Sequence, residues 1–330
     1  MAKKDSAGNK QAKIAFTLGG EVSTEKDPDP SAVGIYKVKD EKLKELEDTP
    51  LSALETGGTY LNAELLRAED LEHIKARQNV RKNVVNVNAN LDFKLSDNIT
   101  FRLGGNVAYD NHHAFAYEYA LINPSHNSQN ISSTKRIYGK LTHKLGKGQS
   151  KDDKTTSLFQ NAYYTLQVGY TKYKETVQDD IHKDKLFDYG YIGKFENQRA
   201  RAYSLDTNAA GDTIYEQIQW SDTNLIFTPG TQNPLAANYT TQYEDLVGAP
   251  NGTSAIQGSQ YYLLNGVRPR SVYSIWYNTG RVNNQYYNID QSQLRATGQF
   301  SADVKNHAIQ LGFEYEKRDD RYWNISPIGM

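Results

Sequence analysis

The chain has 330 residues, with 38 lysine and arginine residues against 39 aspartate and glutamate residues and a formal net charge of -1. A charge this close to zero gives no long-range field that would attract nucleic acid. Because the chain has no cysteine, it has no disulfides, no thiolate chemistry and no cysteine-ligated metal centre. No apolar run approaches the roughly 20 residues of a transmembrane helix, whereas a transmembrane β-barrel hides its apolar surface by alternation.

The first predicted strand covers residues 14–22, and a long connection follows it. Two short helices are predicted in this connection, at residues 39–47 and 68–78. The second has Leu71, Ile74 and Val80 at helical spacing, with acidic residues near its start.

The clearest pattern lies in residues 85–109, where apolar residues alternate with polar ones. The turn residues 96–98 divide this segment into two arms, which predicts a hairpin. Each arm has about 11 residues, more than the usual ~5 to 6 of a globular strand and close to the ~9 to 11 that cross a bilayer. We therefore predict that the apolar side of both arms faces lipid. Its members are Val85, Val87, Leu91, Phe93, Ile99, Phe101, Leu103 and Val107.

A second hairpin near the end of the sequence repeats this pattern around the turn residues Lys305 and Asn306. Less regular strands are predicted at residues 137–145, 162–173, 189–205 and 213–220, which makes nine candidate strands in all. The lipid-facing residues predicted on these later strands are Leu166, Val168, Phe300, Ile309, Leu311 and Phe313.

The connections between the predicted strands alternate in length along most of the chain. Short connections such as 96–98 and 206–212 are interspersed with long ones such as 23–84 and 221–293. This alternation is typical of an outer-membrane barrel, which has short periplasmic turns and long external loops. The proline-rich segment 228–251 is predicted to be an irregular loop.

Tyrosine is the dominant aromatic residue, with 24 copies. Many tyrosines lie near predicted strand ends and are expected to form belts at the membrane interface. Those in loops could stack on a ligand, and three loops, 23–79, 111–135 and 221–288, are expected to capture it. The candidate ligand contacts are His112, His113, Tyr117, Tyr119, Tyr239, Tyr243, Tyr261, Tyr262, Trp276 and Tyr286.

No residue pattern supports catalysis or metal binding. The histidines, including His126, have no metal-site spacing and are interpreted as solvated loop residues. The acidic residues around Asp27 and Asp179 match no calcium loop and are interpreted as polar loop residues. The chain lacks a nucleophile elbow, a phosphate-binding loop with lysine and a His-Glu-x-x-His motif. We therefore predict no enzyme activity, no catalytic residue, no metal and no cofactor.

The sequence resembles the barrel of a TonB-dependent outer-membrane receptor of the large-loop, SusC-like kind. The resemblance is carried by residues 75–79, 103–105, 184–195, 228–230, 238–243 and 312–316, and it covers residues 13–330. It implies an all-β fold, an antiparallel transmembrane barrel of roughly 22 strands, of which this chain supplies about nine. It also implies uptake of a scarce nutrient, namely a glycan, a siderophore or a peptide, across the outer membrane of a Gram-negative bacterium.

In this interpretation residues 1–330 form part of one barrel domain, and residues 1–12 form a periplasmic turn. The expected partners are outer-membrane lipid, the TonB complex and a surface lipoprotein. The TonB complex would act through a plug domain, which is not visible in this sequence. Because nine antiparallel strands cannot close a barrel that needs an even number, the chain is expected to be an interior fragment.

Two other functions remain open from the sequence. A small complete barrel acting as an anchor or adhesin would need one more strand within residues 221–288. A soluble β-rich carbohydrate-binding protein would instead bury the apolar faces of the two clear hairpins in a closed core.

Overall fold

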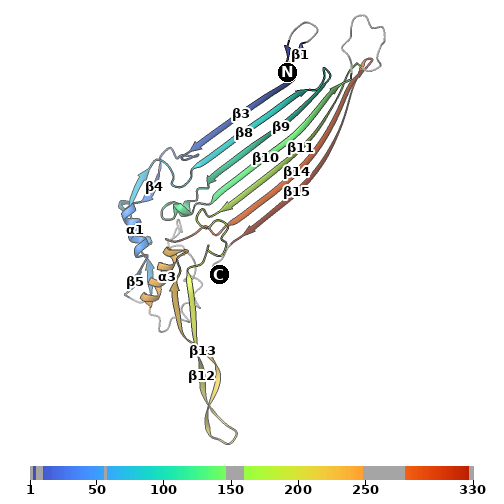
Figure 1. The fold of residues 1–330 in the computed structure, drawn as a ribbon. Helices are drawn as coiled ribbons and strands as arrows, with labels where there is room; N and C mark the ends of the chain where they lie inside the picture. Colours follow the sequence, from blue (N-terminus) through green and yellow to red (C-terminus); the bar gives the residue numbers. More distant parts are fainter. Residues whose placement is uncertain (1–2, 5–9, 56–57, 146–159, 248–278, 327–330) are drawn as a thin grey trace.

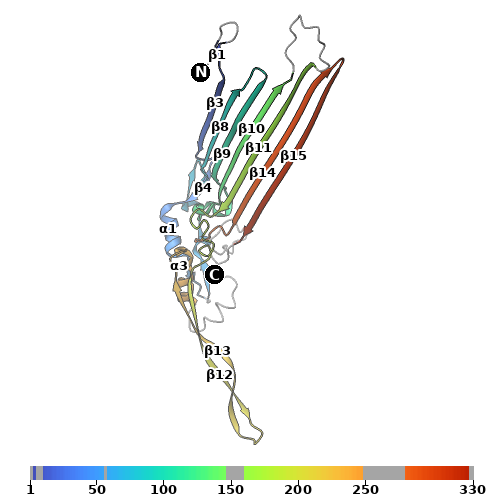
Figure 2. The same cartoon turned by 45° about the vertical axis from the view of Figure 1, so that its right-hand side comes forward.

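The structure is a computed structural model, and it describes all residues except 1–2, 5–9, 56–57, 146–159, 248–278 and 327–330. Its main element is an open antiparallel sheet of seven long strands in the order β15-β14-β11-β10-β9-β8-β3. The strands lie side by side in one slanted array (Figures 1 and 2). They are β3 (Ile14–Glu25), β8 (Lys82–Lys94), β9 (Ile99–His113), β10 (Gln129–Lys144), β11 (Gln160–Gln178), β14 (Tyr286–Val304) and β15 (His307–Ile325).

The register of the sheet brings the apolar residues of all seven strands onto one face. Phe101 is paired with Phe93 on one side and with Leu141 on the other. Leu141 is paired in turn with Leu166. Since side chains alternate between the two faces of a strand, these pairs fix the face of every second residue. We call it the apolar face, and all the residues that the sequence predicts to face lipid lie on it.

Connections at the two ends of the sheet differ in length. At one end, which we call the turn end, the chain reverses over residues 95–98 and 305–306. At the other, the loop end, lie the segments 26–81, 114–128 and 179–285. The predicted alternation is confirmed at these sites, but the connection of residues 145–159 at the turn end has as many residues as the 114–128 segment at the loop end. The predicted short connection at residues 206–212 joins β12 to β13, outside this sheet.

The strands β12 (Gly193–Thr207) and β13 (Thr213–Pro229) are not part of the sheet. They pair only with each other and form a hairpin that projects away from the loop end (Figure 1). The prediction of nine strands in one wall is wrong in this respect, because the sheet has seven. The reason is that β11 pairs directly with β14, so the intervening residues 179–285 form one long excursion from the loop end.

The loop-end segments contain short elements of their own. They are β4 (Ile35–Val38), α1 (Asp40–Asp48), β5 (Leu51–Ala53), β6 (Thr59–Leu61), the 3-10 turns Asn62–Leu65, Ala68–Asp70 and Pro124–His126, β7 (Leu71–Ile74), α2 (Tyr117–Ala120) and α3 (Pro234–Val247). At the turn end, β1 (Lys3–Lys4) pairs with β2 (Lys10–Gln11). The helix predicted at residues 39–47 is confirmed by α1.

Two predicted elements of the loops are wrong. Residues 68–78 form a 3-10 turn and then β7, because Leu71 and Ile74 pair with β4 and this pairing outweighs the helical spacing. Residues 228–251 contain α3, which starts at Pro234, a residue suited to the first turn of a helix.

Two small apolar clusters hold these loop elements together. One joins Val38, Leu46, Ala63 and Ile122, so that it connects the first and second long segments. The other packs Tyr239 and Tyr243 of α3 against Leu51 and Leu61. No helix in the described part of the chain is both long enough and apolar enough to cross a membrane.

Candidate functional site

The apolar face of the sheet is uncovered over the described residues. Phe16 is 79% exposed, Leu311 is 64% exposed, and Val168 at the middle of the sheet is 54% exposed. Neither loop-core cluster includes a residue of the seven strands. In water such a face would leave far more contiguous apolar surface exposed than a soluble monomer tolerates.

The apolar stripe has a similar length on most strands but shifts along them from one side of the sheet to the other. Residues 85–93 and 294–302 each cover about 26 Å of strand at ~3.3 Å per residue. On β9 the stripe reaches Tyr109, which is paired with Ser133, yet on β10 it stops at Ile137. On β15 it stops at Tyr315, still further from the loop end. A slab of fixed thickness crossed by tilted strands produces this drift, because each strand then enters the slab at a different residue.

The opposite face of the sheet is polar, and several of its charged residues form ion pairs. Arg102 Nε lies 2.6 Å from Asp92 Oδ1 on the neighbouring strand, and Arg295 lies 2.7 Å from Glu314. A hollow of about 550 Å³ on this face is lined by Arg136, Arg295 and amide and hydroxyl side chains. This polar face can bind water or a polar ligand along its length.

The first long loop is held to the end of β3 by an ion pair. The Arg77 guanidinium binds Asp27 through Nη2 at 2.6 Å and through Nε at 3.0 Å, and the Arg77 backbone N–H donates to the same carboxylate. Burial alone would raise the pKa of Asp27, but these bonds to Arg77 lower it below its ordinary value of 3.8. Arg77 also lies over the Phe115 ring at 4.9 Å, which links this loop to the second one.

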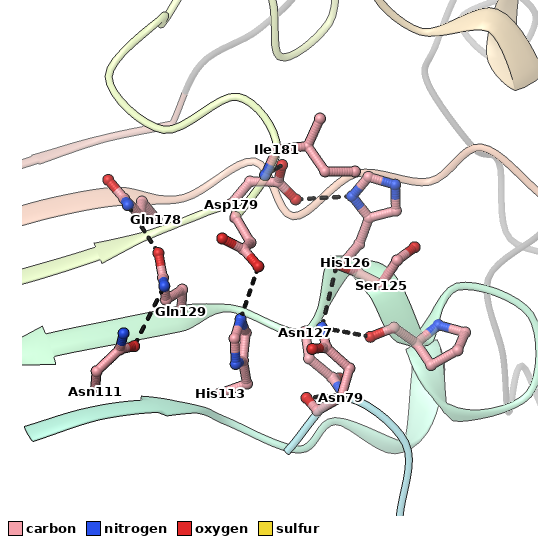
Figure 3. A network of polar contacts seen from close by, with 12 residues as sticks. Asn79, Asn111, His113, Ser125, His126, Asn127, Gln129, Gln178, Asp179 and Ile181 are labelled. Atoms are coloured by element: carbon pink, nitrogen blue, oxygen red, sulfur yellow. Dashed lines mark hydrogen bonds and ion pairs between the residues drawn. The ribbon is translucent and has the colours of Figure 1, made fainter. Parts of the chain in front are cut away.

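A buried clamp joins the second loop to the third, as Figure 3 shows. His126 Nδ1 lies 2.7 Å from Asp179 Oδ2, and the backbone N–H groups of Ile181 and His182 donate to Asp179 Oδ1 at 3.0 and 3.1 Å. The Asp179 side chain is fully buried. Its burial would raise its pKa, yet the bond to His126 and the two backbone bonds lower the pKa overall.

The clamp extends into the third loop through Tyr189 and Asn233. Tyr189 Oη accepts the backbone N–H of Asp179 and donates to the Lys183 carbonyl at 2.6 Å. Burial is the main cause that raises the pKa of Tyr189 to about 12, so this hydroxyl stays protonated. Asn233, just before α3, lies 2.8 Å from His182 Nε2 and donates to two further backbone carbonyls.

The same clamp reaches the first loop through two asparagines. Asn79 donates to the carbonyls of Pro124 and Ser125, and Asn127 donates back to the carbonyls of Gln78 and Asn79 (Figure 3). The three long segments are thus bonded into one assembly at the loop end. We call the group His126, Asn127, Asp179, Tyr189 and Asn233 the loop clamp.

The structure separates the predicted ligand contacts into several environments. His112 lies 2.5 Å from Asp110, and His113 lies 3.2 Å from Asp180. Tyr117 is 75% exposed with its ring against Phe115, while Tyr119 lies in α2 beside it.

The remaining predicted ligand contacts fall into three groups. Tyr239 and Tyr243 are buried against Leu51 and Leu61, so they stabilise the loops and offer little surface to a ligand. Tyr286 is the first residue of β14 and is partly exposed at the loop end. The other three predicted contacts, Tyr261, Tyr262 and Trp276, lie outside the described residues.

Sequence reasoning missed the loop clamp. The interpretation of His126 as a solvated loop residue is wrong, because it is buried and bonded to the buried Asp179. They are far apart in the sequence, and no motif spacing connects them. Within the described residues, His, Cys, Asp and Glu side chains form no group of three or more that could hold a metal ion.

Comparisons of the chain with protein-family models, with curated proteins and with solved structures found no match. The functional argument therefore rests on the geometry of the two sheet faces and of the loop end.

Proposed function

We propose that this chain forms part of the wall and external loops of an outer-membrane receptor for TonB-dependent uptake of a scarce nutrient. In this proposal the apolar face contacts lipid and the polar face lines the lumen. The joined loops at the loop end capture the ligand outside the cell, and a glycan, a siderophore or a peptide is the class of cargo.

One observation carries the membrane part of the proposal. Seven strands place apolar residues in register on one uncovered face, and the limit of this stripe drifts across the sheet as a tilted wall in a slab requires. The stripe length of about 26 Å along the strand agrees with the ~25 Å apolar band of such walls, although the tilt of the strands reduces its height. A soluble protein of the alternative kind would need a second layer over the same residues.

Support for the receptor part comes from the loop end. The segments 26–81, 114–128 and 179–285 lie at one end of the sheet, and the loop clamp bonds them to one another. Such preorganised loops lower the entropy cost of closing on a ligand. The wall also needs further strands beside β3 and β15, since unpaired edge groups cannot remain in lipid.

The membrane part can be tested by single-cysteine labelling, because the natural chain has no cysteine. Cysteine would replace Val87 or Val168 on the apolar face and Asn88 or Gln167 on the polar face, in membranes of cells that make the full protein. We expect a fluorophore at residues 87 and 168 to be quenched by brominated lipid, and one at residues 88 and 167 to resist this quenching. Equal quenching within each adjacent pair would overturn the membrane placement.

The uptake part has a separate test. Cells that lack the protein should lose accumulation of one nutrient class among labelled glycans, siderophores and peptides. This accumulation should also stop when the proton-motive force is dissipated in cells that have the protein. Accumulation that continues without the proton-motive force would contradict TonB-dependent uptake while leaving the membrane placement intact.

A further inference from the structure

The apolar face changes character immediately beyond its stripe, on the side of the long loops. At these strand positions it has five cations and two carboxylates. They are Lys135, Lys172, Lys174, Lys317 and Arg321, with Asp290 and Asp319. Lys135 and Lys172 are a direct cross-strand pair, so two like charges are held side by side on this surface.

Most of this positive charge is not neutralised by the protein. Asp290 is bonded to Lys172, and Lys174 is 3.8 Å from the same carboxylate with 62% of its side chain exposed. Lys135 and Lys317 are exposed and have no carboxylate within ion-pair distance in the described part of the chain. Surface lysines repel one another when so placed, and a bound anion would relieve this repulsion.

A hollow of about 840 Å³ continues the basic surface beside β3, β8 and β9. It borders the same face of the sheet, because its lining residues Asn83 and Asn111 lie on the face that also holds Val85 and Tyr109. Its wall contains the exposed cations Lys26, Lys75 and Arg81, together with amide side chains that can donate hydrogen bonds.

The distribution of charge on this face is asymmetric. Beyond the stripe on the turn side, the strand positions of the apolar face hold His143, Val304 and His307, and within the seven strands they hold neither lysine nor arginine. A solvated rim would have no reason to confine its basic residues to one end. A membrane whose two leaflets differ in charge would give this pattern.

We propose that Lys26, Lys75, Arg81, Lys135, Lys174 and Lys317, the basic belt, bind the phosphate headgroups of anionic lipid in the leaflet on the loop side. This inference rests on the membrane placement proposed above and adds a lipid-binding site to it.

The spacing along the strands favours lipid over a protein partner. On β10, Lys135 lies two positions beyond Ile137 in the direction of the loop end. On β15, Lys317 lies two positions beyond Tyr315 in the same direction. Two positions are about 7 Å of strand, which places the ammonium groups in a headgroup layer of roughly 5 to 8 Å. Lysine stems can also run along the apolar stripe while the charged ends reach the phosphates.

The test compares two triple variants of the full protein, with the further strands that the proposed wall needs, and both variants lose the same net charge. The belt variant contains Lys135→Gln, Lys174→Gln and Lys317→Gln. The control variant contains Lys13→Gln, Lys140→Gln and Lys144→Gln, at positions with the parity of the polar face. Partitioning into vesicles would be measured with phosphatidylcholine alone and with added phosphatidic acid, after circular dichroism has verified equal strand content.

We expect phosphatidic acid to increase the partitioning of the wild type and of the control variant. The belt variant should lose on the order of 100-fold of this gain at low salt, since each basic residue near an anionic surface contributes about fivefold. The single variant Lys135→Gln should lose about fivefold, which provides a milder test if the triple variant folds poorly. If the belt and control variants lose the same part of the gain from phosphatidic acid, the proposal of a lipid-binding basic belt is overturned.

Two further outcomes separate the proposals. If the wild type fails to enter vesicles of phosphatidylcholine alone, the proposed membrane placement fails, whatever the lysines do. If inorganic phosphate abolishes the gain while sulfate at equal ionic strength does not, the belt binds a free anion and the assignment to lipid is overturned.

Discussion

At the scale of single residues, Asp179 has the largest expected effect within the loops. Its carboxylate is buried and bonded to His126 and two backbone N–H groups. In Asp179→Asn an amide replaces one accepting oxygen, and the negative charge that faces His126 Nδ1 is lost. We expect a local destabilisation of about 1 to 3 kcal/mol, measured as faster hydrogen exchange at residues 126–128 and 179–183.

Asp184→Asn provides the matched control for this prediction. Asp184 is exposed on the same loop, and only its backbone carbonyl has a recorded hydrogen bond in the described structure. Its replacement should leave hydrogen exchange unchanged. Equal acceleration in both variants would mean that the loop charge, and not the clamp, sets the local stability.

Acid should weaken the contacts that hold the loops together. The pKa values of Asp27 and Asp179 lie below the ordinary 3.8 in the folded chain, so folding favours their ionised forms. This contribution is fully present above the unfolded value and is lost as the pH falls through the lower folded values. Hydrogen exchange in the loops should therefore rise below about pH 3.8, and less steeply in Asp179→Asn. An equal acid response in that variant would contradict the role of Asp179.

At the scale of elements, the close approach of β9 and β10 depends on Gly105. A Cβ atom at this position would lie 2.6 Å from the Arg136 carbonyl oxygen, which is backbone and cannot rotate away. We expect Gly105→Ala to lower the free energy of unfolding by about 1 to 3 kcal/mol, measured by denaturant titration in detergent. Gly20→Ala, whose Cβ would meet no atom closer than 3.6 Å, should change it far less.

The elements also show what the sequence could and could not predict. The two clear hairpins were predictable because alternation is a local property, and β8, β9, β14 and β15 preserve it. The partner of β11 could not be predicted, since nothing in the local sequence indicates that β11 pairs with β14 across residues 179–285. For the same reason β7 was mistaken for a helix, and the loop clamp required contacts that only the folded loops bring together.

At the scale of the whole molecule, the β12–β13 hairpin is separable from the wall. Its strands pair only with each other and form a sheet of their own, apart from the seven-stranded sheet. We expect replacement of residues 195–227 by a short Gly-Ser linker to leave the protease-protected strands in membranes unchanged, as measured by mass spectrometry. Loss of protection over β11 or β14 would show that the hairpin supports the wall.

The direction of the two edge strands limits how molecules of this kind can associate. Neighbours alternate in direction along the order β15-β14-β11-β10-β9-β8-β3, so β3 and β15 run the same way. If two copies lay in one bilayer with the same orientation, their edge strands could pair only in parallel. A parallel pair does not continue an antiparallel ladder. In the proposed barrel, pairing β3 of one copy with β15 of another is therefore a poor way to complete the wall, and a closed antiparallel wall would need an odd number of strands between β15 and β3.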